Sequence, residues 1–332
     1  TRAPRTTDVS VGIQQVLVPS LTLFLEGEVR RTDFLMRRRN LNLPVSAQFT
    51  DAYGRSVYGT LSKEGAIVAA MGDDSYRFDG FGDVWALDPD GWSEYRGATV
   101  GVEYADDAVD LFGSYTFSET TDNRLGAGSG DLDAALSPGL PTAADGATPW
   151  DEGTSDFDVP HRLTAGLTMR AGAAELSAVY RFRSGRPFTP SYRAGVDANG
   201  DGSLRNDVAH VPAATELGTV LDTWSCLEDQ VESFAARNSC RGPGSHTLDA
   251  RIRVRLGAWG GRTTTLVLDG LNLVEPSGGI VDDALLLVDP AADLTTSDGT
   301  VTIPVTVNEN FGSVRYSWSR GRMLRVGLKV GG

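Results

Sequence analysis

The segment Ser245–Gly257, SHTLDARIRVRLG, alternates between apolar and polar side chains along its whole length. Successive residues of a β-strand point to opposite faces, so this pattern predicts a strand with two different surroundings. The apolar face would carry Leu248, Ala250, Ile252, Val254 and Leu256. The opposite face would carry Thr247, Asp249, Arg251, Arg253 and Arg255. A strand of this kind separates an apolar medium from a wet one.

Eight further runs show the same two-residue period. Each is close to the length of about nine to eleven residues that a tilted strand needs to cross a bilayer. The runs are Asp8–Val18, Leu21–Leu35, Ser93–Tyr104, Ala108–Thr120, His161–Arg170, Glu175–Gly185, Arg262–Leu273 and Met323–Val330. No segment of useful length has apolar residues at helical spacing, and residues 226–237 form the one short helix candidate.

The connections between these runs alternate in length. Tight turns are expected at Pro19–Ser20, Ala105–Asp107, Ala171–Ala174 and Gly257–Gly261, and the intervening loops are tens of residues long. Outer-membrane barrels have short periplasmic turns and long extracellular loops, and their closed sheets pair every backbone group within lipid. The sequence therefore predicts an all-β, antiparallel transmembrane barrel, although a soluble two-layer sheet would also produce alternation.

The number of runs is odd, whereas bacterial single-chain barrels have even strand numbers. We therefore expect residues 1–332 to be the C-terminal portion of a larger barrel. The formal net charge of -14 argues against a nucleic-acid partner, because neutralising phosphates requires a basic surface. Cations are the more natural partners of such a chain.

Several segments, in the right order, resemble one known family. They are RRRNLNLP at 37–44, SYTFSETTDN at 114–123, the long run at 156–190, DANGDGSLRND at 197–207, NSCRGPGSHTLDARIRVRL at 238–256 and LVLDGLNL at 266–273. Together they look like the C-terminal barrel of TonB-dependent outer-membrane receptors of the Oar-like branch.

The resemblance implies a 22-stranded barrel plugged by an N-terminal domain, with TonB as the energy-coupling partner. It implies uptake of an unknown extracellular ligand across the outer membrane of a Gram-negative-type bacterium, with outer-membrane lipid around the strands. The plug would lie outside residues 1–332. The alternative is a non-transporting surface β-protein, adhesive or structural, whose acidic loops bind cations.

One loop carries a candidate calcium site. Asp197, Asn199 and Asp201 stand at positions 1, 3 and 5 of an EF-hand-like loop, and the Ser203 carbonyl stands at position 7. Position 12, where a bidentate Glu is expected, is occupied by Val208, so Asn206, Asp207, water or another loop would have to complete the shell. The alternative is an Asx-rich turn in which these side chains cap backbone amides without any metal.

The remaining chemistry is sparse. Cys226 and Cys240 lie in one loop with no His beside them, which favours a disulfide over a zinc site and leaves two free thiols as the alternative. No catalytic constellation is evident, so we expect no enzyme. The charges of Asp249, Arg251, Arg253 and Arg255 are expected to line the barrel lumen, as a basic ladder for an anionic substrate or paired with acidic neighbours.

Overall fold

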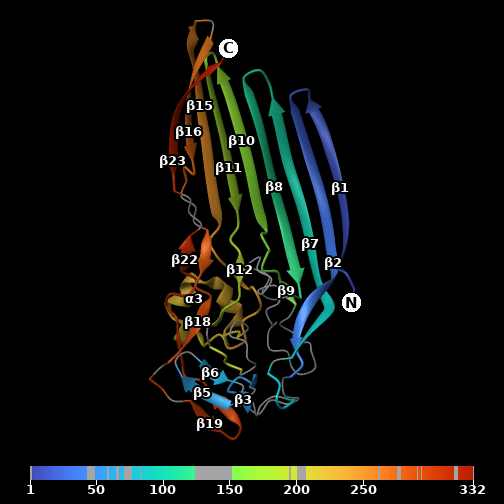
Figure 1. The fold of residues 1–332 in the computed structure, drawn as a ribbon, viewed down its shortest axis with the longest axis vertical. Helices are drawn as coiled ribbons and strands as arrows, with labels where there is room; N and C mark the ends of the chain where they lie inside the picture. Colours follow the sequence, from blue (N-terminus) through green and yellow to red (C-terminus); the bar gives the residue numbers. More distant parts are fainter. Residues whose placement is uncertain are drawn as a thin grey trace.

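The structure is a computed structural model, and Figure 1 shows a tall curved sheet with a domain built from loops at one end. The residues that it describes are 2–42, 49–57, 60–64, 67–70, 77–82, 84–123, 152–193, 196–199, 207–260, 262–274, 278–289, 291–292, 294–317 and 321–331. None of the helices among these residues is long and apolar enough to cross a membrane.

The main sheet is antiparallel, and its strands follow one another in chain order. Its long strands are β1 (Arg5–Val18), β2 (Leu21–Asn40), β7 (Trp85–Ala105), β8 (Val109–Asp122), β10 (His161–Ala171), β11 (Ala174–Arg183), β15 (Ser245–Trp259), β16 (Arg262–Leu271) and β23 (Met323–Gly331). The short β9 (Gly153–Thr154) pairs with the end of β8. All nine predicted strands are present, which confirms the all-β antiparallel expectation.

The strands β2 and β7 are longer than the sequence pattern predicts. Their pairing continues past Leu35 to Asn40↔Trp85, through two register shifts near Leu35. Phe34, at the first shift, has a φ of 62°, a left-handed conformation that a side chain of this size rarely adopts outside an irregularity. This two-stranded ribbon therefore bends away from the sheet and enters the loop domain.

Register puts most of the apolar residues of the nine strands on one face. One row of paired residues runs Ile13, Leu25, Val100, Tyr115, Leu163, Phe182 and His246. Another runs Val109, Met169, Leu176, Ile252, Leu268 and Val326. We call this the outer face. A face of this size would be unstable in water, since Val11 is 74% exposed and Leu324 is 79% exposed.

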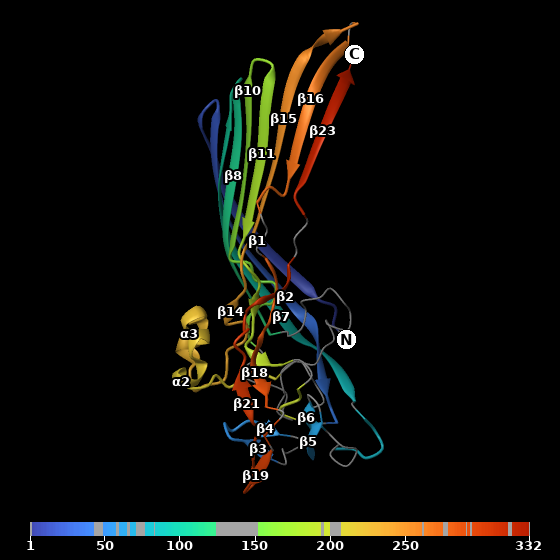
Figure 2. The same cartoon turned by 90° about the vertical axis from the view of Figure 1, so that its left-hand side faces the viewer.

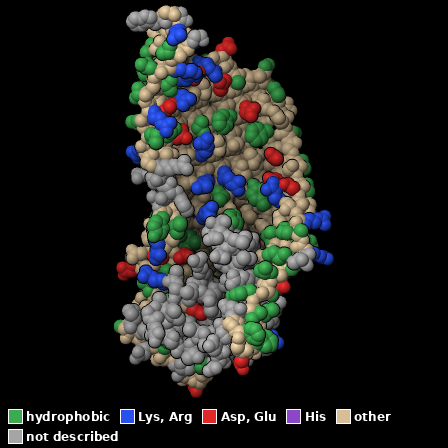
Figure 3. All heavy atoms as spheres, in the orientation of Figure 1, with side chains coloured by type: hydrophobic (Ala, Val, Ile, Leu, Met, Phe, Trp, Pro, Cys, Tyr) green, Lys and Arg blue, Asp and Glu red, His purple; other side chains and the backbone are tan. Residues whose placement is uncertain are grey.

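The opposite face, which we call the inner face, is the concave surface in Figure 3, and many charged side chains lie on it. Two aromatic rings on this face lie over glycines of the neighbouring strand. A Cβ atom added at Gly101 would collide with the Phe24 ring, and one added at Gly166 would collide with the Phe112 ring. These glycines therefore provide the space that lets the rings lie flat against the sheet.

The strands are joined by tight turns at one end of the sheet, which we call the turn end. Between β10 and β11, Ala171 pairs directly with Ala174 and leaves a two-residue turn. Its first residue, Gly172, has a φ of 57°, which glycine adopts at no steric cost and which two-residue hairpin turns require. Three of the four predicted turns are confirmed, and the turn expected at Gly257–Gly261 is shorter than predicted, because β15 continues to Trp259, which pairs with Arg262.

The long connections meet at the other end and form the loop domain (Figures 1 and 2). Its short strands are β3 (Phe49–Asp51), β4 (Ser56–Val57), β5 (Thr60–Glu64), β6 (Ile67–Ala70), β12 (Pro187–Phe188), β13 (Ser191–Tyr192), β14 (Cys240–Arg241), β17 (Gly279–Val281), β18 (Ala284–Val288), β19 (Thr295–Ser297), β20 (Thr300–Thr302), β21 (Val305–Val307) and β22 (Val314–Ser317). Pairing of β3 with β20 joins the loop after β2 to the loop after β16.

The loop domain has its own hydrophobic core. The core contains Phe188, Val211, Leu227, Leu285 and Leu286, all under a tenth exposed, with Trp224 packed against it. Two short helices, α2 (Ala214–Leu217) and α3 (Thr219–Thr223), precede a 3-10 helix at Ser225–Gln230. The helix expected over residues 226–237 is therefore wrong beyond Gln230, where the chain turns to reach β14.

Candidate functional site: the loop domain and the inner face

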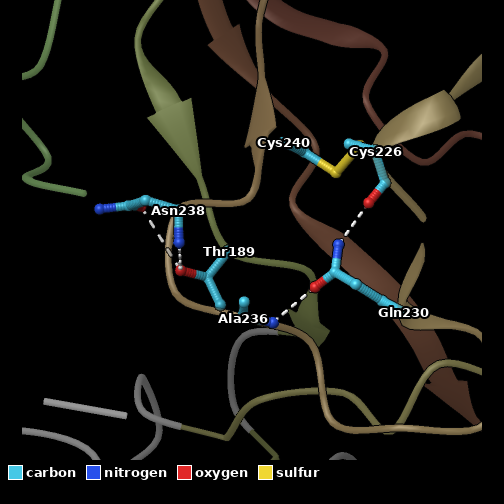
Figure 4. Close-up of a disulfide and its surroundings, with 6 residues drawn as sticks. All are labelled: Thr189, Cys226, Gln230, Ala236, Asn238 and Cys240. Carbon is cyan, nitrogen blue, oxygen red and sulfur yellow. Dashed lines mark hydrogen bonds between the residues drawn. A yellow bond between two sulfur atoms is a disulfide. The ribbon is translucent and has the colours of Figure 1, made fainter. Parts of the chain in front are cut away.

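A disulfide joins Cys226 of the 3-10 helix to Cys240 of β14, as predicted (Figure 4). The two Cα atoms are 5.3 Å apart, and Cys240 is fully buried in the core of the loop domain. The Gln230 side chain bridges two parts of the loop that the disulfide closes. Its amide nitrogen donates to the Cys226 carbonyl, and its amide oxygen accepts the Ala236 N–H at 2.6 Å.

The disulfide loop is fastened to the end of β8 through Arg237. This buried arginine forms an ion pair with Asp122 at 2.6 Å and also donates to the Asp122 carbonyl at 2.9 Å. The side-chain amide of the neighbouring Asn238 donates to Asp156 at 2.6 Å, and the backbone N–H of Asn238 donates to the Thr189 hydroxyl at 2.8 Å. Because a buried charge is tolerated only when it is paired, these contacts fix the loop over the sheet.

A second buried arginine, Arg55, contacts residues of two different long loops. Its guanidinium lies 3.3 Å from Asp51 and 3.8 Å from Asp207, and it donates to the Val208 carbonyl at 2.7 Å. It also lies over the Phe234 ring at 4.8 Å. Arg55 therefore joins the loop after β2 to the loop after β13.

Aromatic side chains pack beside Arg55, whose guanidinium also lies over the Tyr192 ring at 5.4 Å. The ring of Tyr53 stacks on His210 at 3.7 Å, and Phe234 meets His210 edge-on at 5.2 Å. Burial lowers the pKa of His210, and burial raises the pKa of Tyr192 to about 12. Both groups are therefore held in their neutral forms at pH 7.

The predicted calcium ligands are only partly visible. Asp197, Asn199 and Asp207 are buried, at 2%, 0% and 3% exposed. Asp201 and Ser203 lie outside the described residues. Asp207 accepts the Ala198 N–H at 3.0 Å and lies beside Arg55, so it has a role within the loop domain apart from any metal. Among the described residues no group of three acidic, His or Cys side chains has a metal-binding arrangement. Calcium binding stays a prediction.

Four residues were expected to line the lumen. Asp249, Arg251, Arg253 and Arg255 all share the inner-face register with Glu175 of β11 and Asp269 of β16. Arg251 contacts Asp269 with two nitrogens, at 2.6 and 3.3 Å. Arg253 contacts Glu175 at 3.2 Å, and Asp249 lies 3.7 Å from Arg181. Cross-strand ion pairs, rather than a free basic ladder, therefore account for three of these four side chains.

Two matching clusters lie on the outer face, near the loop domain. Tyr115 of β8 lies 2.8 Å from Nδ1 of His161, and Phe117 lies beside the same ring at 5.4 Å. Two strands further on, Tyr180 lies 2.7 Å from Nδ1 of His246, with Phe182 at 4.9 Å. Rings with one polar edge favour the boundary between lipid and water, so the clusters mark where the apolar face ends.

An apolar outer face, a charged inner face and aromatic residues at one boundary define a membrane-spanning β-sheet. Comparison with known families agrees. Residues 1–275 match the family of outer membrane β-barrel domains. The chain belongs to this family, and its location is the outer membrane. The turn end is then periplasmic and the loop domain extracellular.

Among solved structures, the chain is similar to the outer membrane transporter YddB from Escherichia coli. The two share 9% identical residues, with a TM-score of 0.44. The similarity covers 84% of this chain and 30% of that one, so the chain spans less than a third of the transporter's length. No curated protein matches the chain.

Proposed function

We propose that the chain is the C-terminal part of a TonB-dependent receptor of the Oar-like branch, which takes up an extracellular ligand across the outer membrane. The observation that carries this proposal is the loop domain at the extracellular end of a hollow, charged wall. Its core joins the connections after β11 and β16, the pairing of β3 with β20 adds the connection after β2, and Arg237 ties the disulfide loop to the end of β8. A barrel that only anchors a protein has no need of so ordered a cover. We expect a plug domain and TonB as partners, and no catalytic activity.

The test uses cells that produce the full-length protein, with and without TonB. Mass spectrometry of the medium should show that these cells deplete a compound only when both the full-length protein and TonB are present. Cross-linking should capture TonB on the full-length protein. Equal depletion with and without TonB, together with no cross-link, would instead favour the adhesive or structural surface protein that binds cations without transport.

A further inference from the structure

Three arginines meet on the inner face directly beneath the loop domain. Arg162 of β10 and Arg183 of β11 are direct cross-strand partners. Arg181 stands two residues before Arg183 on β11, opposite Thr164. All three are exposed on the hollowed face, where Figure 3 shows basic side chains gathered close to the loop domain. We call them the arginine cluster.

Like charges directly opposite each other on neighbouring strands are destabilising. Elsewhere on this face the protein avoids the problem with carboxylates. Arg170 forms an ion pair with Asp110, and Arg170 also lies 4.0 Å from Glu175. Glu175 in turn holds Arg253. A continuous chain of alternating charges thus crosses β8, β10, β11 and β15 near the turn end.

The arginine cluster lacks this compensation. Arg181 lies 3.7 Å from Asp249, and this is the one carboxylate contact that the cluster has among the described residues. Arg183 donates to the Ser245 hydroxyl at 2.9 Å. Arg162 lies over the Tyr95 ring, 6.0 Å from its centre. Within the described part of the chain, three positive charges therefore share one acidic partner.

The distribution of charged residues over the whole inner face adds to the excess positive charge at the arginine cluster. Between the turn end and the register shifts near Leu35, inner-face register places Asp8, Glu26, Glu28, Glu103, Asp110 and Asp122, with Arg30 as the basic residue, on β1, β2, β7 and β8. It places Arg162, Arg170, Arg181, Arg183, Arg251, Arg253, Arg255, Arg325 and Lys329, with Glu175, Asp249 and Asp269, on β10 to β23. The wall is polarised, and an anion within it is drawn toward the later strands.

We infer that the arginine cluster is a binding site for a small anionic solute that carries more than one phosphate or carboxylate group. Guanidinium forks match the planar oxygens of these groups in bidentate geometry. Directly opposed strand residues are about 4.5–5.5 Å apart at Cα, and alternate residues along a strand are about 7 Å apart. Two linked anionic groups span that spacing better than one.

This inference rests on the proposed uptake function, and it names the chemistry of the solute that the receptor would pass inward. Binding can be measured without transport, so the two proposals fail separately. Inorganic pyrophosphate and inorganic phosphate are the probes, titrated calorimetrically into the full-length protein in detergent at low salt. The native protein should bind pyrophosphate more tightly than phosphate, and added sodium chloride should weaken both.

The matched variants are Arg162→Gln/Arg183→Gln and, as a control, Arg251→Gln, whose arginine is already engaged by Asp269. The first should weaken pyrophosphate binding at least tenfold, and the second should change it less than twofold. Arg162→Lys/Arg183→Lys keeps the charges and should restore part of the affinity. Heat-modifiable migration on gels checks that each variant is folded. Absence of pyrophosphate binding to the native protein, or equal affinity in all variants, would overturn the inference.

Discussion

The hydroxyl of Tyr180 lies 2.7 Å from Nδ1 of His246, across the boundary between β11 and β15. The same pairing recurs between Tyr115 and His161, two strands earlier. In both cases the Tyr stands two residues before a Phe on an outgoing strand, and the His stands at the start of an inward strand. The repetition places two identical polar contacts on the lipid-facing side of the sheet at the extracellular boundary.

Tyr180→Phe should lower the free energy of unfolding by about 1 kcal/mol, because it removes one hydrogen bond and keeps the ring. The same change at Tyr115 should act alike. Tyr316→Phe is the control, since Tyr316 is 70% exposed in the loop domain. Urea unfolding of the full-length protein in detergent measures the effect. Equal shifts in the test and control variants would show that the Tyr–His contacts do not stabilise the barrel.

Removing the disulfide should loosen the loop domain and leave the sheet intact. The bond closes a loop with a sequence separation of 14, and in the chain-entropy model a loop of this size contributes roughly 3 kcal/mol. The variant Cys226→Ser/Cys240→Ser should be cut by protease within residues 226–240, while heat-modifiable migration persists. Protease resistance equal to that of the native protein would mean that Arg237 and the core hold the loop without the disulfide.

Enlarging Gly101 should destabilise the sheet, because the Phe24 ring occupies the space above it. Overpacking of this kind costs about 1–3 kcal/mol. Gly101→Val should therefore reduce the folded fraction recovered in detergent. Gly27→Val is the control, since nothing lies within 4 Å of a Cβ atom added there. The double variant Gly101→Val/Phe24→Ala should recover part of the loss, and failure to do so would contradict the packing argument.

Sequence alone predicted the sheet well and the loop domain poorly. Alternation such as that from Leu248 to Leu256 is dictated by the two media on either side of a membrane strand, so it can be read locally. The core of the loop domain depends on contacts between distant connections, such as Phe188 with Phe311. No local period records these contacts.

The same reason explains which site residues were missed. Arg55 and Arg237 stand in polar stretches without any motif, and their role appears only when Asp207 and Asp122 are brought to them from elsewhere in the chain. The disulfide was predictable because only two cysteines are present. The inner-face ion pairs required register, which pairs Arg251 with Asp269.

The loop domain should lose stability as the pH falls. Burial lowers the pKa of His210, so the unfolded chain binds its proton more readily than the folded one. The stability contributed by neutral His210 is therefore fully present above the unfolded pKa of about 6.5 and is lost as the pH falls toward the lower folded value. Amide hydrogen exchange in the loop domain at pH 8 and pH 5.5 measures this.

The control for that experiment is His210→Phe, which keeps a ring against Tyr53 and removes the titrating group. It should flatten the difference in exchange between the two pH values. A native-like pH dependence in this variant would assign the effect to another group.

Calcium should bind weakly to the loop that begins at Asp197. Hard oxygen ligands at alternate positions suit this ion, and Val208 stands where the closing Glu is expected, so affinity should fall in the roughly 10⁻⁴ to 10⁻³ M range of extracellular modules. The buried positions of Asp197 and Asn199 favour a loop that is ordered around its polar side chains.

Calorimetric titration of the full-length protein at millimolar calcium should give a saturable heat. The variant Asp197→Ala/Asp201→Ala should abolish it, whereas Asp222→Ala/Asp229→Ala, which removes two exposed carboxylates from the same domain, should not. Identical heats in all three proteins would leave a polar turn, with Asp207 serving Arg55 and the backbone alone.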